Sequence, residues 1–410
     1  MKKSLGGSLD TVLVHAGNLR QHPEQVPTSP TIYPSTSYRA DTPELMDAIL
    51  GGEVNGYTYA RHGSPTVEAF ASAVAALEGA DHAVAFASGM AAIDAAWYAI
   101  GVKNGDRVLV SRDLYGASLN LTHTLWGLGG VEAIAVDLTD LKGLEHILNS
   151  VKPTGILFET LSNPILKAPD LKKIVAMCHG VGCQVIVDNT FATPLMVQPL
   201  EWGADLVVHS ATKYLGGHGD AVGGVTAGGE SYKNALHQYL KLRGGILGPF
   251  EAWLLHRGIK TLGVRFERQC ANALIVAQAL EDSQVFRKVY HPLLISHPTH
   301  ELAVAQFGTK LGGAVVTLEL PGGRDVVYRF LKELHLVGSA TTVGDVYTLC
   351  LYPRMASHRN QSPEELQKMG ITDGTVRIAV GLEHASDIID DILGAVHKAL
   401  DPTGVSVGKV

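Results

Sequence analysis

The central part of the chain alternates between two hydrophobic patterns. Short runs rich in valine, isoleucine and leucine predict buried strands, and segments with apolar residues every three or four positions predict helices. The predicted strands are HAVAFAS, RVLVS, TGILFET, CQVIVDNT and ADLVVHSAT, and the predicted helices include VEAFASAVAALEG and MAAIDAAWYAIG. Apolar strands separated by helices are typical of a parallel sheet that is covered by helices on both faces.

This pattern changes toward both ends of the chain. The first sixty residues are rich in proline, threonine, serine and glycine without sustained periodicity, which predicts an extended arm. Near the other end, GAVVTLEL and TVRIAVGLE predict strands of a smaller sheet, and Ile388, Ile392 and Val396 predict one apolar face of a helix. The expected parts are an N-terminal arm at 1–62, a large α/β domain at 63–260 and an α+β domain at 261–410.

Composition and charge indicate which kinds of partner the protein has. A chain of 410 residues exceeds the size of a single hydrophobic core, and its high content of hydrophobic residues (46%) against charged ones (18%) favours burial of surface between subunits. The net charge of −7 supplies no basic field, so neither nucleic acid nor a membrane surface is an expected partner.

The termini and cysteines add expectations about location and metals. The N-terminal sequence has no apolar core of a signal peptide, and no run of eighteen apolar residues occurs, so we expect a cytoplasmic protein. Four cysteines do not make a disulfide framework in so long a chain. Cys178 and Cys183 lack a second pair at zinc-finger spacing, and we therefore expect no metal site.

Polar residues follow the predicted strands as a set. Ligands of open α/β sheets bind beyond the carboxyl ends of the strands, so these positions are candidates for chemistry. Taken singly, each has an ordinary structural explanation as a helix cap, a turn or a solvated charge. The positions are Ser88-Gly89-Met90, Tyr115, Thr160 with Asn163-Pro164, Asp188-Asn189-Thr190, and Ser210-Ala211-Thr212-Lys213.

Taken together, these residues fit one ligand. The Ser-Gly turn offers backbone N–H groups to a phosphate, and the hydroxyls of Ser210 and Thr212 add donors. Asp188 can hold a pyridine nitrogen protonated, and Tyr115 can stack on the ring. Lys213 can form a Schiff base with an aldehyde. Phosphate, pyridinium and Schiff base together indicate pyridoxal 5′-phosphate (PLP) as the cofactor.

The order of these motifs resembles a known family. The motifs are Tyr-x-Tyr-x-Arg at 57–61, Ser-Gly-Met at 88–90, Glu-Thr-x-x-Asn-Pro at 159–164, Val-Asp-Asn-Thr-Phe at 187–191 and Ser-Ala-Thr-Lys-Tyr at 210–214. From about residue 11 to about residue 397, the chain resembles the PLP enzymes of cysteine and methionine metabolism, the transsulfuration family. This resemblance implies fold type I, as in aspartate aminotransferase, with a mainly parallel large-domain sheet and a smaller α+β domain. It also implies a homotetramer made of two dimers, with active sites shared across each dimer.

The resemblance also implies roles for individual residues. In the catalytic set, Lys213 carries the cofactor and takes the α-proton, and Tyr115 stacks on the ring and assists the leaving group. The other implied cofactor-binding residues are Asp188 at the pyridine nitrogen, Asn163 at the 3′-oxygen, Ser88, Gly89, Met90, Ser210 and Thr212 around the phosphate, and Tyr59 and Arg61 of the arm at the neighbouring subunit's phosphate. The implied substrate-binding residues are Arg377 at the α-carboxylate, Thr342 and Tyr59.

Departures from the family pattern bear on the reaction. Thr58 and Tyr347 stand where enzymes that act on cystathionine carry acids, which weakens a cystathionine substrate. Ala117 and Ser64 differ from the methionine γ-lyase pattern. Arg354 suits either an acidic substrate tail, such as a succinyl group, or a solvated surface position.

We therefore expect γ-elimination on methionine or homocysteine, giving 2-oxobutanoate, ammonia and a thiol. The alternatives are γ-replacement, as in cystathionine γ-synthase or O-acylhomoserine sulfhydrylase, and cystathionine γ-lyase activity. A non-catalytic PLP-binding regulator is the alternative of a different class.

Overall fold

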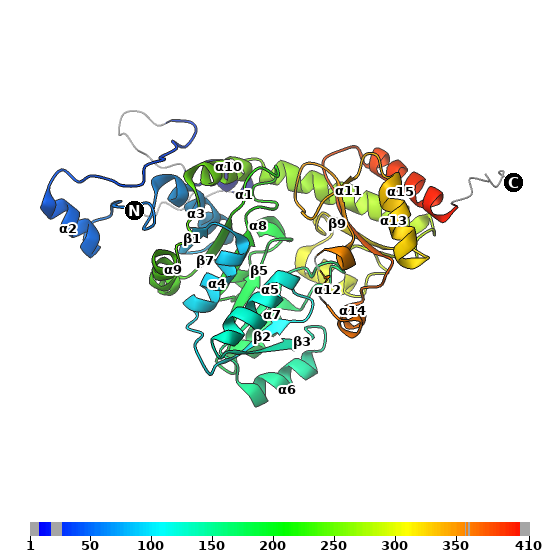
Figure 1. Ribbon diagram of the computed structural model, residues 1–410, viewed down its shortest axis with the longest axis horizontal. Helices are drawn as coiled ribbons and strands as arrows, with labels where there is room; N and C mark the ends of the chain where they lie inside the picture. Colours follow the sequence, from blue (N-terminus) through cyan, green and yellow to red (C-terminus); the bar gives the residue numbers. More distant parts are fainter. Residues whose placement is uncertain (1–7, 18–26, 357, 360, 402–410) are drawn as a thin grey trace. The chain divides into compact units, whose positions relative to one another are not determined.

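The computed structural model describes residues 8–17, 27–356, 358–359 and 361–401, which form two compact units (Figure 1). The expected division at residues 62 and 260 stays a prediction. The units follow another division, because the second unit also takes in two segments from the middle of the chain. The first unit comprises the described residues of Met1–Ser111, Asn120–Glu159 and Leu171–Gly263, and the second those of Arg112–Leu119, Thr160–Asp170 and Val264–Val410.

The first unit is built on a seven-stranded sheet of order β1-β7-β6-β5-β4-β2-β3. Its strands are β1 (His82–Phe86), β2 (Arg107–Ser111), β3 (Glu132–Val136), β4 (Gly155–Glu159), β5 (Gln184–Asp188), β6 (Leu206–Ser210) and β7 (Gly224–Gly228). The neighbouring strands from β3 to β6 are parallel, and β7 is antiparallel to both β1 and β6. The predicted mainly parallel sheet is thus confirmed, with β7 as an added antiparallel strand.

Helices cover both faces of this sheet. Ile156 and Phe158 of β4 belong to a buried cluster with α6 (Leu141–Val151) and α7 (Leu171–His179). Side chains alternate along a strand, so Gly155 faces the other way. A Cβ at Gly155 would lie 3.3 Å from the ring of Trp97 in α4 (Gly89–Ala99), which places α4 on the opposite face.

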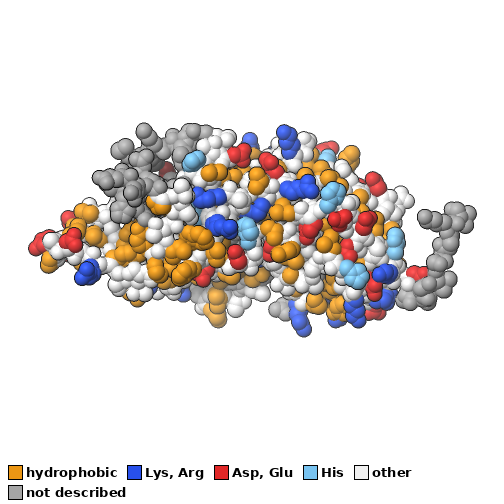
Figure 2. Space-filling view, turned by 90° about the horizontal axis from the view of Figure 1, so that it is seen from above, with side chains coloured by type: hydrophobic (Ala, Val, Ile, Leu, Met, Phe, Trp, Pro, Cys, Tyr) orange, Lys and Arg blue, Asp and Glu red, His pale blue; other side chains and the backbone are white. Residues whose placement is uncertain are grey.

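The arm is more structured than the sequence predicts. Its described residues contain two helices that the sequence pattern did not indicate, α1 (Leu9–His15) and α2 (Pro43–Gly51). The assignment of residues 1–62 as an arm that contacts a neighbouring subunit stays a prediction. Val12 and Leu13 of α1 are buried in the first unit, whereas α2 buries no residue. Leu45 and Leu50 of α2 are exposed, and hydrophobic side chains lie open on the left of the space-filling view (Figure 2). Residues 1–7 and 18–26 of the predicted arm lie outside the described residues.

The other helices of the first unit complete its cover. They are α3 (Pro65–Glu78), the π-helix η1 (Leu121–Trp126), α8 (Thr193–Met196), η2 (Pro199–Trp202), α9 (Glu230–Arg243), α10 (Pro249–Ile259) and the start of α11 (Leu262–Asp282). The predicted helix VEAFASAVAALEG corresponds to α3, which begins at Pro65 and ends before Gly79, a residue with a φ of 68°. Proline at the first position and a left-handed glycine after the last are the expected limits of a helix.

The second unit contains a five-stranded sheet of order β10-β11-β12-β9-β8. Ile388, Ile392 and Val396 of α15 (Ala385–Leu400) are fully buried against it, as their four-residue spacing predicts. The strands are β8 (Lys288–Tyr290), β9 (Val315–Glu319), β10 (Gly338–Ser339), β11 (Leu349–Leu351) and β12 (Thr375–Ala379). Its other helices are α5 (Gly116–Asn120), most of α11, α12 (His300–Phe307), α13 (Gly323–Glu333), η3 (Pro353–Met355) and α14 (Pro363–Met369). Across the described parts of both units, no helix is long and apolar enough to cross a membrane.

Candidate active site

The start of α4 packs directly against the end of β6. Ser88 caps the helix, because its side chain accepts a hydrogen bond from the N–H of Ala91. A Cβ at Gly89 would lie 2.8 Å from Cβ of Ser210, so only glycine allows this approach. The first turn of α4, which includes Met90, therefore lies beside the Ser210 hydroxyl. A helix N-terminus next to a hydroxyl is suited to binding an anion.

Lys213 and Thr212 lie in the turn that follows β6. The N–H of Lys213 donates to the carbonyl of Ser210 at 3.1 Å, which folds the lysine back over the strand end. Thr212 ties the turn to the entry of β7: its hydroxyl donates to the carbonyl of Gly223 at 3.2 Å and accepts from the N–H of Gly223 at 3.0 Å. The lysine is thus held close to Ser210 by the backbone.

Asp188 is a buried carboxylate at the end of the neighbouring strand, β5. One of its oxygens, Oδ1, accepts hydrogen bonds from the N–H and the hydroxyl of Thr190. The same hydroxyl accepts from the N–H of Ser210 at 2.9 Å. Burial raises the pKa of Asp188, against the opposing effect of the two Thr190 hydrogen bonds and the charge of His209. A nearby cation would favour the charged form of this group.

The arm residues Tyr59 and Arg61 lie together in the first unit. The guanidinium of Arg61 lies 5.6 Å from the ring centre of Tyr59, and its Nη1 donates to the carbonyl of Lys241 in α9. A bridge between Ser37 and Tyr59 pairs the two halves of the arm. The structure thus brings these two residues to each other and to α9. Their contact with a neighbouring subunit stays a prediction.

In the second unit, the structure brings together three of the predicted residues. Arg377 on β12 is buried, and its guanidinium forks between two acceptors: Nη1 donates to Oδ1 of Asn163 at 3.1 Å, and Nη2 donates to the carbonyl of Thr342 at 3.0 Å. Such a fork fixes the orientation of the guanidinium plane.

His358 completes the surroundings of Arg377, and sequence reasoning missed it. It is buried, and burial lowers its pKa to about 4, with a further lowering by the charge of Arg377. A neutral histidine beside the guanidinium avoids a second buried positive charge. Nothing in the local sequence pattern marks His358, because its role depends on a contact with Arg377, which lies nineteen residues further along the chain.

Tyr115 lies in the inserted segment that precedes α5 in the second unit. The residue is 42% exposed. Two residues earlier, Asp113 accepts hydrogen bonds from Nζ of Lys167 at 3.0 and 3.1 Å. This ion pair joins the Tyr115 segment to the segment that carries Asn163, so the two inserted pieces of the second unit support each other.

Two positions that depart from the family pattern have defined surroundings. Arg354 forms an ion pair with Asp373, with 2.6 Å between Nη1 and Oδ1. Tyr347 is 65% exposed. Elsewhere among the described residues, no cluster of histidine, cysteine or acidic side chains could hold a metal ion, and all four cysteines are buried and unbridged.

The residues of the first unit fit PLP. The α4 terminus and Ser210 offer donors to a phosphate, and the close approach at Gly89 leaves the backbone accessible. Asp188 is a buried acid whose raised pKa reflects desolvation that a pyridinium partner would offset. Lys213 supplies the amine on the turn between these groups.

Comparisons with known proteins agree with this fit. Residues 10–397 match the model of the family described as Cys/Met metabolism PLP-dependent enzyme. The chain is 40% identical to O-succinylhomoserine sulfhydrylase of Pseudomonas aeruginosa, covering 94% of each chain, and 38% identical to L-methionine gamma-lyase of Porphyromonas gingivalis, covering 88% of this chain and 90% of that one.

A solved structure from Campylobacter jejuni that carries N′-pyridoxyl-lysine-5′-monophosphate shares the fold. It is 29% identical with a TM-score of 0.90, and covers 95% of this chain and 100% of that one. The expected fold type I architecture and the PLP cofactor are confirmed. This chain belongs to the Cys/Met metabolism PLP-dependent enzyme family.

Proposed function

We propose that this PLP-dependent enzyme of sulfur amino acid metabolism catalyses γ-elimination on methionine or homocysteine, which releases 2-oxobutanoate, ammonia and a thiol. The observation that carries this choice is the pairing of Arg354 with Asp373. In this ion pair Asp373 neutralises the positive charge of Arg354, which would otherwise suit the carboxylate of a succinyl ester. Thr58 and Tyr347 provide no carboxylate for the distal ammonium of cystathionine, which favours a small, uncharged substrate tail.

The residues of the first unit have separate tasks in this proposal. When bound, PLP supplies an aldehyde that reacts with amines and a ring that withdraws electrons. The amine Nζ of Lys213 would hold the cofactor, and as a free amine it would take the proton from the α-carbon of the substrate. Asp188 keeps the ring nitrogen protonated, and the α4 terminus with Ser210 and Thr212 binds the phosphate.

The residues of the second unit act on the substrate. We assign the α-carboxylate to Arg377, because Asn163 and the Thr342 carbonyl already fix its guanidinium plane. The phenol of Tyr115 gives a proton to the departing thiolate. Its ring is open enough to stack on the cofactor.

A γ-replacement reaction on O-succinylhomoserine is the second candidate. It is favoured by the 40% identity to O-succinylhomoserine sulfhydrylase over 94% of the chain. In this reaction succinate leaves the γ-carbon, and the sulfur of an added thiol bonds there in place of the proton that ends an elimination. A non-catalytic regulator is disfavoured, because every residue of the assigned set is present.

The experiment compares 2-oxobutanoate release from methionine, homocysteine, cystathionine and O-succinylhomoserine, with and without an added thiol. The proposal expects thiol-independent release from methionine or homocysteine. A thioether product that forms only with the thiol, without 2-oxobutanoate, would refute it in favour of γ-replacement. Lys213→Ala should abolish turnover and the visible absorbance of the bound cofactor, and a fully active variant would contradict the assignment.

We also propose a homotetramer in which Tyr59 and Arg61 serve the neighbouring site. Tyr59 is partly exposed, and α2 of the same arm buries nothing within its own chain, which supports an arm that packs on another subunit. The Arg61→Ala variant and the Lys213→Ala variant should each be inactive alone. Refolding a mixture of the two should restore activity, because one site in each mixed dimer is then intact. Mixed dimers that stay inactive would place Arg61 in its own subunit's site.

A further inference from the structure

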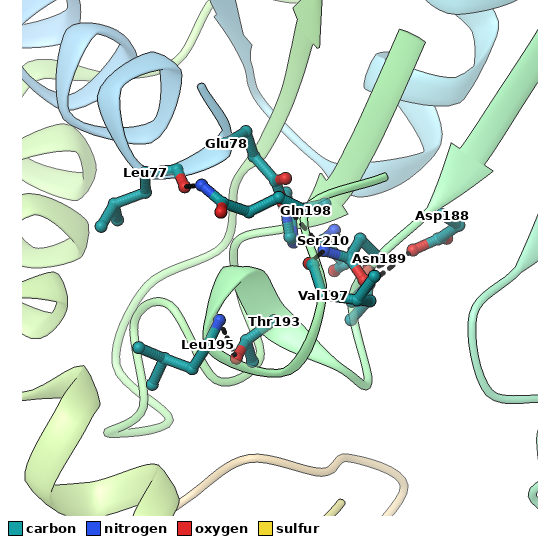
Figure 3. Close-up of polar contacts among 11 residues, drawn as sticks. Leu77, Glu78, Asp188, Asn189, Thr193, Leu195, Val197, Gln198 and Ser210 are labelled. Atoms are coloured by element: carbon teal, nitrogen blue, oxygen red, sulfur yellow. Dashed lines mark hydrogen bonds and ion pairs between the residues drawn. The ribbon is translucent and has the colours of Figure 1, made fainter. Parts of the chain in front are cut away.

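A buried carboxylate lies behind the proposed cofactor site, on the opposite face of the sheet. Glu78, the last residue of α3, is 0% exposed, and its Oε1 lies 2.6 Å from Nε2 of His209, which is 1% exposed. The same oxygen accepts from Nδ2 of Asn189 at 2.9 Å. Figure 3 shows Glu78 and Asn189 beside the residues that they contact.

The two residues that donate to this carboxylate are each adjacent in sequence to a proposed cofactor-binding residue. Asn189 directly follows Asp188, and His209 directly precedes Ser210. Side chains alternate across a strand, so Ser210 faces α4 and His209 faces away from it. One oxygen of Glu78 therefore ties together the two strand ends that carry the proposed ligands of the ring nitrogen and the phosphate.

Further hydrogen bonds extend this tie to the loop that follows Asp188. Nδ2 of Asn189 also donates to the carbonyl of Val197 at 2.9 Å, and Gln198 donates to the carbonyl of Leu77 at 2.6 Å (Figure 3). On the α4 face, the Thr190 hydroxyl joins Asp188 to the N–H of Ser210. The spacing of the two strand ends is thus fixed from both faces of the sheet.

The network is poorly explained by stability alone. A carboxylate at the C-terminus of a helix faces the negative end of the helix dipole, and a carboxylate–histidine contact buried this deeply gains little over apolar packing. Three buried polar atoms of the network find no hydrogen-bond partner among the described residues: Oε2 of Glu78, Nδ1 of His209 and Oδ1 of Asn189. Polar groups that break the rules of stability in this way are typical of functional regions.

We propose that Glu78, His209 and Asn189 form a positioning network that fixes the distance between Asp188 and Ser210, and so matches the site to the rigid span from ring nitrogen to phosphate. None of the three is assigned to the cofactor itself, because their side chains meet on the face of the sheet opposite α4. This inference rests on the cofactor-binding roles assigned above to Asp188, Ser210 and Lys213.

The test measures two properties of the folded protein: the Kd for PLP, by titrating the apoprotein, and the visible absorption maximum of the bound cofactor. Glu78→Leu removes the shared acceptor, so the Kd should rise about tenfold and the maximum should shift. Glu78→Gln keeps an acceptor oxygen of the same reach and should stay within about threefold of the wild type. Asn189→Ala, a milder change, should act in the same direction as Glu78→Leu and serves if the leucine variant does not fold.

Asp205 provides a matched control in the same unit. Its carboxylate accepts from the N–H of Val185 in β5 and from the hydroxyl of Tyr232, and it directly precedes β6, so it joins the same two strands at the ends away from the proposed ligands. Asp205→Ala should lower the melting temperature without a change in the absorption maximum. A folded Glu78→Leu or Asn189→Ala with wild-type Kd and spectrum would overturn the inference. Equal losses in Glu78→Gln and Glu78→Leu would overturn it too, because charge rather than position would then be responsible.

Two further variants separate this inference from the cofactor assignment. Asp188→Asn and Lys213→Ala test that assignment directly. If both leave the spectrum unchanged, the assignment itself is wrong. If both respond and Glu78→Leu does not, only the positioning network is wrong.

Discussion

The hydroxyl of Thr190 links two of the proposed cofactor-binding residues. It donates to Asp188 and accepts from the N–H of Ser210, so a single oxygen serves both proposed ends of the cofactor. Thr190→Val is close to isosteric and removes both hydrogen bonds. Asp188 then keeps only the backbone N–H of residue 190, and its pKa should rise further, because the hydroxyl now opposes the effect of burial.

The size of the effect follows from the kinds of bond that are lost. A hydrogen bond to a charged group contributes about 1.5–3 kcal/mol, and a loss of about 2 kcal/mol corresponds to a roughly 30-fold weaker Kd for PLP. Since protonation of Asp188 removes the partner of the ring nitrogen, the weakening should grow as the pH falls. Titration of the apoprotein with PLP at several pH values measures both quantities.

Thr190→Ser is the control for this substitution, because it keeps the hydroxyl and loses only a methyl group. It should bind PLP nearly as the wild type does. If Thr190→Val matched the serine variant at every pH, the hydroxyl would have no role in holding Asp188, and the reasoning from these hydrogen bonds would be refuted.

Three other outcomes are expected. Arg377→Lys loses the fork between Asn163 and Thr342 and should raise the KM for the amino acid at least tenfold, with less effect on the Kd for PLP; an unchanged KM would contradict carboxylate binding. Burial lowers the pKa of His291 and His297 to about 4, below the unfolded value of about 6.5. The unfolded chain therefore takes up protons first, so the free energy of unfolding should be constant above pH 6.5 and should fall between pH 6.5 and pH 4. Urea unfolding should show a decrease of at most about 3 kcal/mol for each histidine, and a smaller total decrease in His297→Gln. Asp373→Asn frees the guanidinium of Arg354 and should raise kcat/KM for O-succinylhomoserine about two- to fivefold over O-acetylhomoserine, and an equal effect on both esters would separate Arg354 from the acyl tail.

The fold was predictable where the sequence pattern was strong. Continuous apolar runs predicted β4, β5 and β6, because strands that are buried on both faces carry few polar residues. The strand β7 was missed because Gly-Val-Thr-Ala-Gly has small residues in place of a Val/Ile run. Its glycines are required by neighbours: a Cβ at Gly224 would lie 2.1 Å from the carbonyl oxygen of Ser88. In the arm, α2 was missed because Pro34 and Pro43 suggested extended chain, and α1 was missed because it is only seven residues long.

The residues proposed to face the ligand could be predicted from the sequence, whereas the residues that support them on the other face of the sheet could not. Residues proposed to face the ligand follow strand ends, and such positions are recognisable from the chain alone. Their supports are not recognisable in this way. Glu78 ends a helical pattern and reads as a solvated charge, and only the fold buries it beside His209, 131 residues along the chain. A motif therefore specifies which groups meet the ligand, whereas their spacing depends on distant residues.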